Sequence, residues 1–128
     1  MSKKIEEIYP YEDEQEKLLY QTVRLIPKDF RARVPDGNGG YKWGLHGTRK
    51  VPYRLPEFIQ SDYVCIAEGE RDVESLREIN KVSTCNPFGS GKWLPEFNQY
   101  FEGKRVVIFY DNDPPGIAHA QNIAVNLW

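Results

Sequence analysis

The pattern of apolar positions separates two parts of the chain with different character. Two runs of five apolar or aromatic residues, 63–67 and 106–110, stand out in the second half. Each run is too short for a globular helix and is rich in β-branched or aromatic residues, so each predicts a strand buried on both faces. The later strand is expected to cover residues 104–110.

Helical spacing follows these runs. Apolar residues recur every three or four positions within 73–79 and again within 117–127, which predicts two amphipathic helices. A short strand at 82–85 and a helix at 94–101 are expected in between. The order β-α-β-α-β-α predicts an α/β fold with a Rossmann-like parallel sheet and flanking helices.

The first half shows strand-like segments separated by turn residues. Residues 8–11 and 17–26 flank an acidic turn and predict a hairpin, whereas the residues before position 8 predict a loose leader. Residues 35–40 are Pro-Asp-Gly-Asn-Gly-Gly, which favour a turn with positive φ. A small antiparallel β-rich element is therefore expected before the α/β part.

The change of pattern near residue 60 predicts the domain organisation. Residues 1–59 are expected to form the basic β-rich element, and residues 60–128 the α/β domain. An open parallel sheet normally continues with a further strand after its last helix. We therefore expect the chain to be a fragment whose α/β domain is truncated at its C-terminal end.

Composition places the 128-residue chain among globular proteins, since 40% of its residues are hydrophobic and 13% aromatic. No apolar run approaches the roughly 20 residues of a membrane helix, and the N-terminus does not read as a secretory signal peptide. The two cysteines, Cys65 and Cys85, lie in apolar runs without metal-binding spacing. They predict reduced core residues and a cytoplasmic protein with no membrane partner.

The net charge of −2 hides an asymmetry. Residues 24–54 carry eight basic and two acidic side chains, whereas residues 55–128 carry six basic and eleven acidic ones. Aromatic residues interleave with the basic ones, and this pattern can bind a nucleic-acid strand, although such aromatics can equally form the core of a β element. The candidates for nucleic-acid binding are Arg31, Arg33, Lys42, Trp43, Arg49, Lys50 and Arg54.

Carboxylates follow both of the predicted buried strands. Glu68 comes after the first strand, and Asp111 and Asp113 come after the second. Parallel strands place their carboxyl ends at one edge, so these acids would meet if the two strands are neighbours. Clustered acids call for a compensating cation, and oxygen ligands favour Mg²⁺ (or Mn²⁺). In an extended segment the two aspartates would also point to the same side.

A structural alternative exists for part of this pattern, because Asp113 before two prolines also suits a helix N-cap. The companion glutamate on the other strand favours the metal site. Gly69 leaves room for a ligand beside the backbone, and Gly116 could present backbone N–H groups to a phosphate. Lys92 could reach a phosphate at the same edge or remain solvated.

These motifs resemble the Toprim domain, which occurs in bacterial-type primases, topoisomerases, small nucleases and recombination proteins. The matching residues are Glu-Gly-Glu-Arg-Asp at 68–72 and Asp-Asn-Asp-Pro-Pro-Gly at 111–116, and the resemblance covers about residues 60–128. Within this family the chain is most similar to DNA primases of phages, plasmids and other mobile elements. That similarity includes the loop 86–93 and the segment 53–57.

The resemblance implies that Glu68 is a general acid/base or a metal ligand, that Asp111 and Asp113 hold Mg²⁺ or Mn²⁺, and that Asp72 is a supporting acid. It implies Mg-dependent nucleotidyl transfer, in which an RNA primer is made from nucleoside triphosphates on a DNA template. A helicase domain or protein is the implied partner in DNA replication.

The chain departs from the family in having no zinc motif and no fourth strand with a further acid, so its activity as an isolated fragment stays open. A Toprim-type nuclease that cleaves phosphodiester bonds is one alternative. A non-catalytic nucleic-acid-binding fragment is another.

Overall fold

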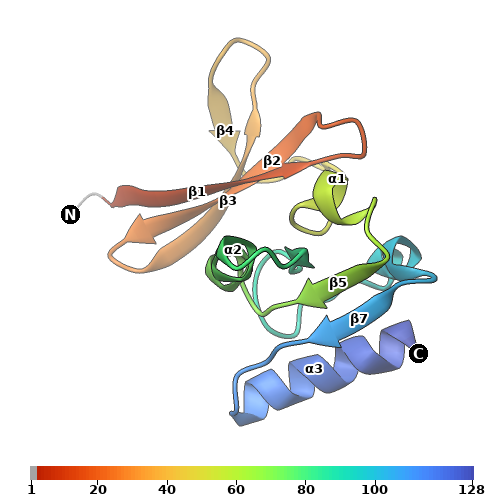
Figure 1. Ribbon diagram of the computed structural model, residues 1–128. Coiled ribbons are helices and arrows are strands. Elements are labelled where there is room, and N and C mark those ends of the chain that lie inside the picture. The colour runs from red at the N-terminus through yellow and green to blue at the C-terminus, as the bar shows by residue number, and fades with distance from the viewer. Residues whose placement is uncertain (1–2) are drawn as a thin grey trace.

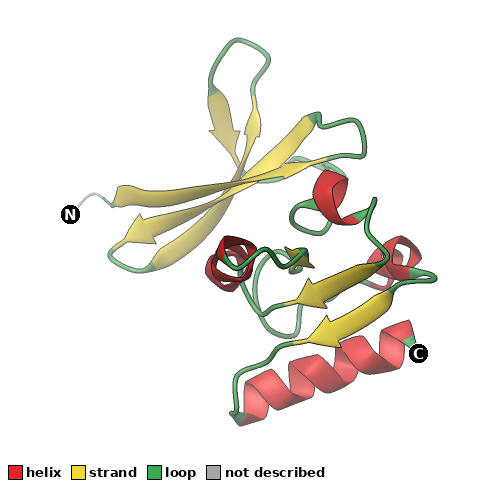
Figure 2. Cartoon of the chain, viewed as in Figure 1, coloured by secondary structure: helices red, strands yellow, loops and turns green. Residues whose placement is uncertain are grey.

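The structure is a computed structural model that describes residues 3–128, and it contains two separate sheets (Figure 1). The elements are β1 (Lys4–Glu12), β2 (Leu18–Ile26), β3 (Asp29–Pro35), β4 (Tyr41–Trp43), α1 (Leu55–Phe58), β5 (Tyr63–Ile66), α2 (Glu70–Glu78), β6 (Ser83–Thr84), the 3₁₀ helix η1 (Pro95–Phe101), β7 (Arg105–Ile108) and α3 (Pro114–Leu127). The N-terminal sheet consists of strands and turns, whereas the helices gather around the second sheet (Figure 2). The expected α/β class with a preceding antiparallel element is confirmed.

The N-terminal sheet is an antiparallel meander in the order β1-β2-β3-β4. Its last turn is built as the sequence predicts, because Asp36 Oδ1 accepts hydrogen bonds from the N–H groups of Asn38 and Gly40 at 2.7 and 3.0 Å. Gly37 and Gly39 adopt φ values of +84° and +86° in this turn. The turn therefore returns β4 against β3, with Val34 opposite Lys42.

The expectation of a loose leader before residue 8 is wrong for the residues that the structure describes. β1 begins at Lys4, and its first residues pair with the far end of β2, Lys4 opposite Ile26 and Ile8 opposite Val23. The side chains of this part are exposed, so no apolar pattern marks the strand. Backbone pairing with β2 and the ion pairs of Glu6 with Arg24 and Arg71 hold it, and residues 1–2 lie outside the described range.

The second sheet is parallel and has the order β6-β5-β7. β5 lies in the middle, with Val64 opposite Val106 and Ile66 opposite Ile108 of β7. The two strands that precede the acidic residues are therefore neighbours, as the candidate site requires. α3 runs back along β7 (Figure 1), and its Ile123 is buried in the core that Val106 and Ile108 border.

β7 differs from the expected strand in length and burial. It ends at Ile108 rather than at residue 110, and Val107 is 50% exposed. The physical reason is that β7 is an edge strand with one neighbour and one covered face. The expected helix at 94–101 is also a 3₁₀ helix, and the last helix begins at Pro114, because proline suits the first helical turn.

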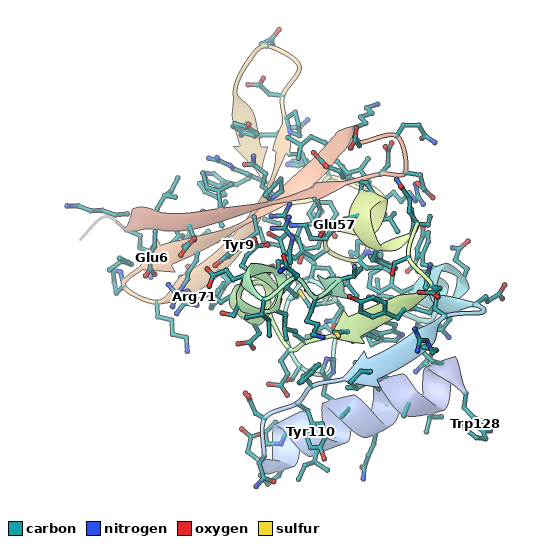
Figure 3. All side chains as sticks on the ribbon, viewed as in Figure 1. Glu6, Tyr9, Glu57, Arg71, Tyr110 and Trp128 are labelled. Carbon is teal, nitrogen blue, oxygen red and sulfur yellow. The ribbon has the colours of Figure 1, made fainter. Side chains whose placement is uncertain are left out.

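The two sheets share one hydrophobic core. Tyr11 of β1 stacks on Tyr20 of β2 at 4.6 Å between ring centroids and lies 5.1 Å from Tyr53. These rings join the same buried cluster as Val64 and Ile66 of β5. Figure 3 shows side chains of β1 and α2 meeting between the layers.

Both cysteines are buried and free, as expected, and burial raises the pKa of each thiol. No helix within residues 3–128 is long and apolar enough to cross a membrane.

Candidate active site

The carboxyl edge of the parallel sheet brings the three predicted acids together. Glu68 follows β5 by two residues, and Asp111 and Asp113 follow β7 by three and five. The N–H of Phe109 donates to the carbonyl of Ile66 at 2.8 Å, which continues the pairing of the two strands to this edge. The neighbouring position of the strands thus confirms the premise on which the site was predicted.

Gly116 marks the point where these groups converge. A Cβ atom on this residue would lie 2.3 Å from the carbonyl oxygen of Asp111, 2.7 Å from Glu68 Oε1 and 2.9 Å from Asp113 Oδ1. Oxygens of all three acidic residues therefore surround one small space above the start of α3. Only glycine leaves that space free.

Glu68 is the member of this group whose carboxyl is partly buried and whose pKa is raised. Its Oε1 atom is buried and has no hydrogen-bond partner in the described chain. Burial, and next the neighbouring Asp111 and Asp113, raise the pKa of the Glu68 carboxyl above its ordinary value. An unpartnered buried carboxylate oxygen beside other acids is the arrangement that a bound cation stabilises.

Asp113 also has the structural role that the sequence allowed. Its Oδ1 accepts a hydrogen bond from the N–H of Gly116 at 2.7 Å, so it is the N-cap of α3. The segment before it is not extended, since the N–H of Asp113 donates to the carbonyl of Asp111 at 2.8 Å. Strand alternation is therefore not what positions the two aspartates. A tight turn instead brings both near Glu68.

The donor set fits a hard cation, although no three His, Cys, Asp or Glu side chains within residues 3–128 already surround a common metal position. All donors are oxygens, one of them is buried without a partner, and a glycine keeps the space between them open. Mg²⁺ and Mn²⁺ bind such oxygens and keep several waters. Glu68, Asp111 and Asp113 are the residues that would hold the ion.

Two of the supporting residues, Gly69 and Asp72, lie at this edge. Asp72, in the first turn of α2, lines two pockets, one of which contains Glu68 and Asp111. Gly69 is the N-cap residue of α2, and a Cβ there would meet nothing within 4 Å. Lys92 is exposed in the loop before η1, so its contact with a phosphate stays a prediction.

Two aromatic residues beside the acids were missed because they were expected to be buried. Phe109 and Tyr110 are 47% and 52% exposed and line a pocket of about 280 Å³ with Glu68 and Asp111. They belong to an apolar run, so the sequence pattern favours burial. Only the edge position of β7 shows that they face solvent.

The basic candidates of the N-terminal half divide into two groups. Arg33 lies over the rings of Tyr41 and Trp43, at 4.1 and 5.8 Å, on the surface formed by β3 and β4. Trp43 is 48% exposed, and Lys42 beside it is exposed as well. This surface keeps the cation-and-ring pattern that suits a single strand of nucleic acid.

The other group is engaged in ion pairs. Arg49 donates to both carboxylate oxygens of Glu14 at 2.8 Å, and Arg54 pairs with Glu74 of α2 at 3.0 Å. Arg31 pairs with Asp29, and Lys50 is half-buried. Arg49 and Arg54 thus have structural roles, while nucleic-acid binding by this group stays a prediction.

Comparison with known proteins supports the fold through structure alone. The sequence matches no protein-family profile and no curated protein. Among solved structures, the primase fragment of the bacteriophage T7 primase-helicase protein superposes with a TM-score of 0.72 at 17% identity, covering 94% of this chain and 48% of that one. Since 94% of the chain is covered, the likeness extends over both sheets.

A second match comes from the bacteriophage T7 lagging-strand DNA polymerase interacting with primase domains of two gp4 subunits bound to an RNA/DNA hybrid and dTTP. It has a TM-score of 0.63 at 19% identity, and covers 94% of this chain and 60% of that one. Both identities are low, so the likeness shows a shared primase-like fold. The chain spans about half the length of the T7 primase fragment.

Proposed function

We propose that this chain is a Toprim-type metal-binding part of a DNA primase. The observation that carries the proposal is the convergence of Glu68, Asp111 and Asp113 around Gly116, with one buried carboxylate oxygen left without a partner. The primase-like fold supports the same assignment, because the match includes the N-terminal sheet as well as the α/β part. The reaction of the whole protein would be nucleotidyl transfer, which extends an RNA primer on a DNA template.

Each residue of the site would have its own role in this reaction. A bound Mg²⁺ supplies positive charge at the phosphate and lowers the pKa of the attacking hydroxyl. Asp111 and Asp113 anchor the ion, with Asp113 held in place by its hydrogen bond to the start of α3. Glu68 would act beside them as a general acid/base or as a third ligand of the ion, because a carboxylate can fill either role.

Metal binding is the direct test. Mn²⁺ should broaden the amide NMR signals of Gly69, Asn112 and Gly116 in the wild-type chain. Glu68→Gln and Asp111→Asn should each weaken Mg²⁺ or Mn²⁺ binding by about tenfold or more, because each removes a charged ligand. Both substitutions are nearly isosteric, so the fold should be preserved.

Glu102→Gln, an exposed acid in the turn between η1 and β7, is the matched control and should bind the metal like the wild type. Undiminished broadening in the double variant Glu68→Gln/Asp111→Asn would overturn the metal site. Incubation of the chain with Mn²⁺ and labelled single-stranded DNA then separates the enzyme classes. Cleavage of the strand would replace the primase assignment with a nuclease.

The proposed partners are a DNA template, nucleoside triphosphates and a helicase. The T7 structures support this proposal of partners, because one is a primase fragment of a primase-helicase protein and the other contains primase domains bound to an RNA/DNA hybrid and dTTP. The exposed surface of Arg33, Lys42 and Trp43 supports template binding. Its contribution should fall steeply with salt, because phosphate contacts release counterions.

A further inference from the structure

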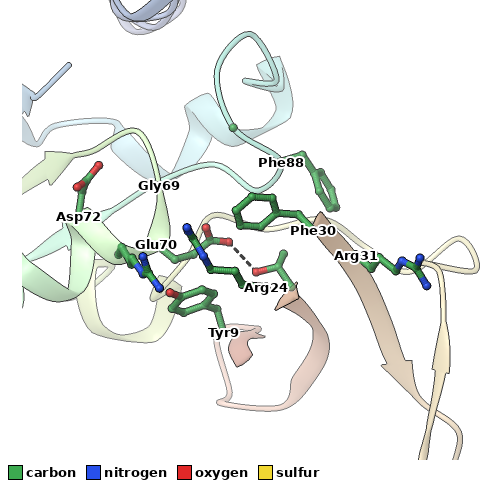
Figure 4. A pocket seen from close by; sticks show the side chains of 11 residues that line it. Tyr9, Arg24, Phe30, Arg31, Gly69, Glu70, Asp72 and Phe88 are labelled. Carbon is green, nitrogen blue, oxygen red and sulfur yellow. Dashed lines mark hydrogen bonds between the residues drawn. The ribbon is translucent and has the colours of Figure 1, made fainter. Parts of the chain in front are cut away.

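A second pocket lies between the two sheets, on the other side of the α2 N-terminus from the acidic edge. It has a volume of about 500 Å³, within the usual range for small-molecule sites. Its lining comes from β1, β2 and β3, from residues 69–72, and from the loop after β6 (Figure 4). We call it the Phe30–Phe88 pocket after its two aromatic walls.

Phe30 and Phe88 form the two aromatic walls, and neither stacks on another aromatic ring within residues 3–128. Phe30 is 48% exposed and Phe88 is 42% exposed, and both line the pocket. Phe88 has a φ of +72°, a conformation that is unfavourable for a bulky residue and that recurs at binding sites. Figure 4 shows the two rings on neighbouring walls, one from β3 and one from the loop.

The floor of the pocket holds polar groups with spare hydrogen-bonding capacity. Tyr9 is only 5% exposed, and its hydroxyl has no hydrogen-bond partner in the described chain. Glu70 accepts hydrogen bonds from Tyr11 and Thr22, at 2.8 and 2.6 Å, through Oε2 alone. Its Oε1 takes part in no hydrogen bond within residues 3–128. A ligand with a donor edge could therefore bind Tyr9 and Glu70 together.

Two arginines lie beside these groups. The guanidinium of Arg24 lies 5.1 Å from the centre of the Phe30 ring, so it extends the stacking wall. Arg24 and Arg71 share one carboxylate, that of Glu6, at 3.1 and 2.8 Å. Because a guanidinium has five N–H donors, both arginines retain donors for an anionic group at the pocket mouth.

We propose that the Phe30–Phe88 pocket binds a single free nucleotide, with its base stacked between Phe30 and Phe88 and the donor edge of the base directed at Tyr9 and Glu70. Aromatic walls suit the base, a carboxylate suits its amino group, and arginines suit the phosphate. A pocket of this volume holds one nucleotide, whereas a strand requires a continuous groove.

This proposal rests on the proposed function and gives it a substrate subsite. Asp72 lines both this pocket and the pocket that contains Glu68 and Asp111. A nucleotide bound in the Phe30–Phe88 pocket would therefore lie next to the acidic edge. The base subsite, however, needs no metal, so it can be tested independently of the metal site.

The test is the binding of adenosine 5′-monophosphate (AMP) in the presence of EDTA, followed by NMR of the ¹⁵N-labelled chain. Binding should shift the amide signals of Phe30, Phe88 and Gly89 at millimolar AMP. Phe30→Ala and Phe88→Ala should each weaken the affinity about tenfold, because each removes one stacking face. Glu70→Gln should weaken AMP more than uridine 5′-monophosphate, which has no exocyclic amine.

Trp128→Ala is the matched control, since Trp128 is an exposed aromatic residue at the end of α3 and outside this pocket, and the AMP affinity of this variant should stay within twofold of that of the wild type. Asp111→Asn should also leave metal-free AMP binding intact, which separates this test from that of the metal site.

Three outcomes would overturn the proposal. The first is AMP affinity that both phenylalanine variants leave unchanged. The second is equal binding of ribose 5-phosphate, which would show phosphate capture without a base site. The third is Phe30-dependent binding of the oligonucleotide (dA)5 by a chain that does not bind AMP.

Discussion

At the residue scale, Gly116 and Asp113 show how one turn serves both folding and chemistry. Asp113 caps α3 by accepting from the N–H of Gly116, and the same bond fixes the carboxylate near Glu68. The sequence supports both a helix cap and a metal ligand, and the structure makes the two roles compatible. The steric need for glycine at 116 depends on the turn at Asp111 and on Glu68, which is 48 residues away in the chain, so the sequence pattern alone does not show it.

Gly116→Ala tests the convergence of the acids. Alanine favours a helix by about 1 kcal/mol over glycine, but its Cβ would lie 2.3 Å from the backbone oxygen of Asp111. We expect a net loss of about 1–3 kcal/mol of unfolding free energy, measured by urea denaturation, and a weaker affinity for Mn²⁺. The backbone must shift to relieve this contact, because the carbonyl oxygen of Asp111 cannot rotate away as a side chain could.

Gly69→Ala is the control for this change. A Cβ at Gly69 meets nothing within 4 Å, and the backbone there is extended with a φ of −150°. Its unfolding free energy should change by less than about 1 kcal/mol, the cost of a poorer N-cap residue. Equal effects of the two substitutions would show that the acids do not crowd Gly116.

At the element scale, the order of strands and helices could be predicted, but their ends and exposure could not. The apolar runs locate β5 and β7, since buried strands carry continuous apolar residues. The same rule fails for Val107, Phe109 and Tyr110, because an edge strand with one covered face leaves apolar residues exposed. The first part of β1 shows the converse, because residues 4–8 are exposed and pair through their backbone without a buried apolar face.

The carboxylate of Glu74 is one of the groups that hold α2 against the N-terminal half. It accepts hydrogen bonds from Tyr53 at 2.8 Å and from Arg54 at 3.0 Å, and from Arg77 of its own helix at 2.8 Å. Burial tends to raise the pKa of Glu74, but these hydrogen bonds outweigh it and lower the pKa overall. The charged form is therefore the one that stabilises the fold.

Glu74→Gln should lower the free energy of unfolding by about 1–2 kcal/mol at pH 7, since it removes charge-assisted hydrogen bonds in a partly exposed site. A carboxyl whose pKa is lower in the folded state stabilises the fold above its unfolded pKa, near 4.5, and this contribution is lost as the pH falls further. The difference between wild type and variant should therefore shrink below pH 4.5 in urea denaturation series. A difference that grows toward acid would contradict this account.

At the scale of the whole molecule, the two halves distinguished in the sequence are two sheets around one core. The sequence shows a change of pattern near residue 60, but not that tyrosines of the first half pack on aliphatic residues of the second. The Phe30–Phe88 pocket escaped prediction for the same reason, because its walls come from segments far apart in the chain. A site whose residues come from two layers of the fold has no short motif in the sequence.

A shared core implies that the two sheets unfold together. Tyr11 is fully buried between them. Its ring stacks on Tyr20, and its hydroxyl donates a hydrogen bond to Glu70 of α2. Tyr11→Ala should lower the free energy of unfolding by about 3–5 kcal/mol, as for other buried aromatic residues. Because the ring supports both layers, amide hydrogen exchange should quicken to a similar extent in β2 and in β5.

The exposed residue Tyr41 provides the comparison, and Tyr41→Ala should leave exchange in β5 unchanged. If Tyr11→Ala quickened exchange in β2 while β5 kept its full protection, the sheets would be independent units. The pocket between them would then be a gap between separate bodies. With joint unfolding, its walls are fixed by the same core that positions Glu68 and Asp111, so a nucleotide bound there meets the acidic edge at a constant distance.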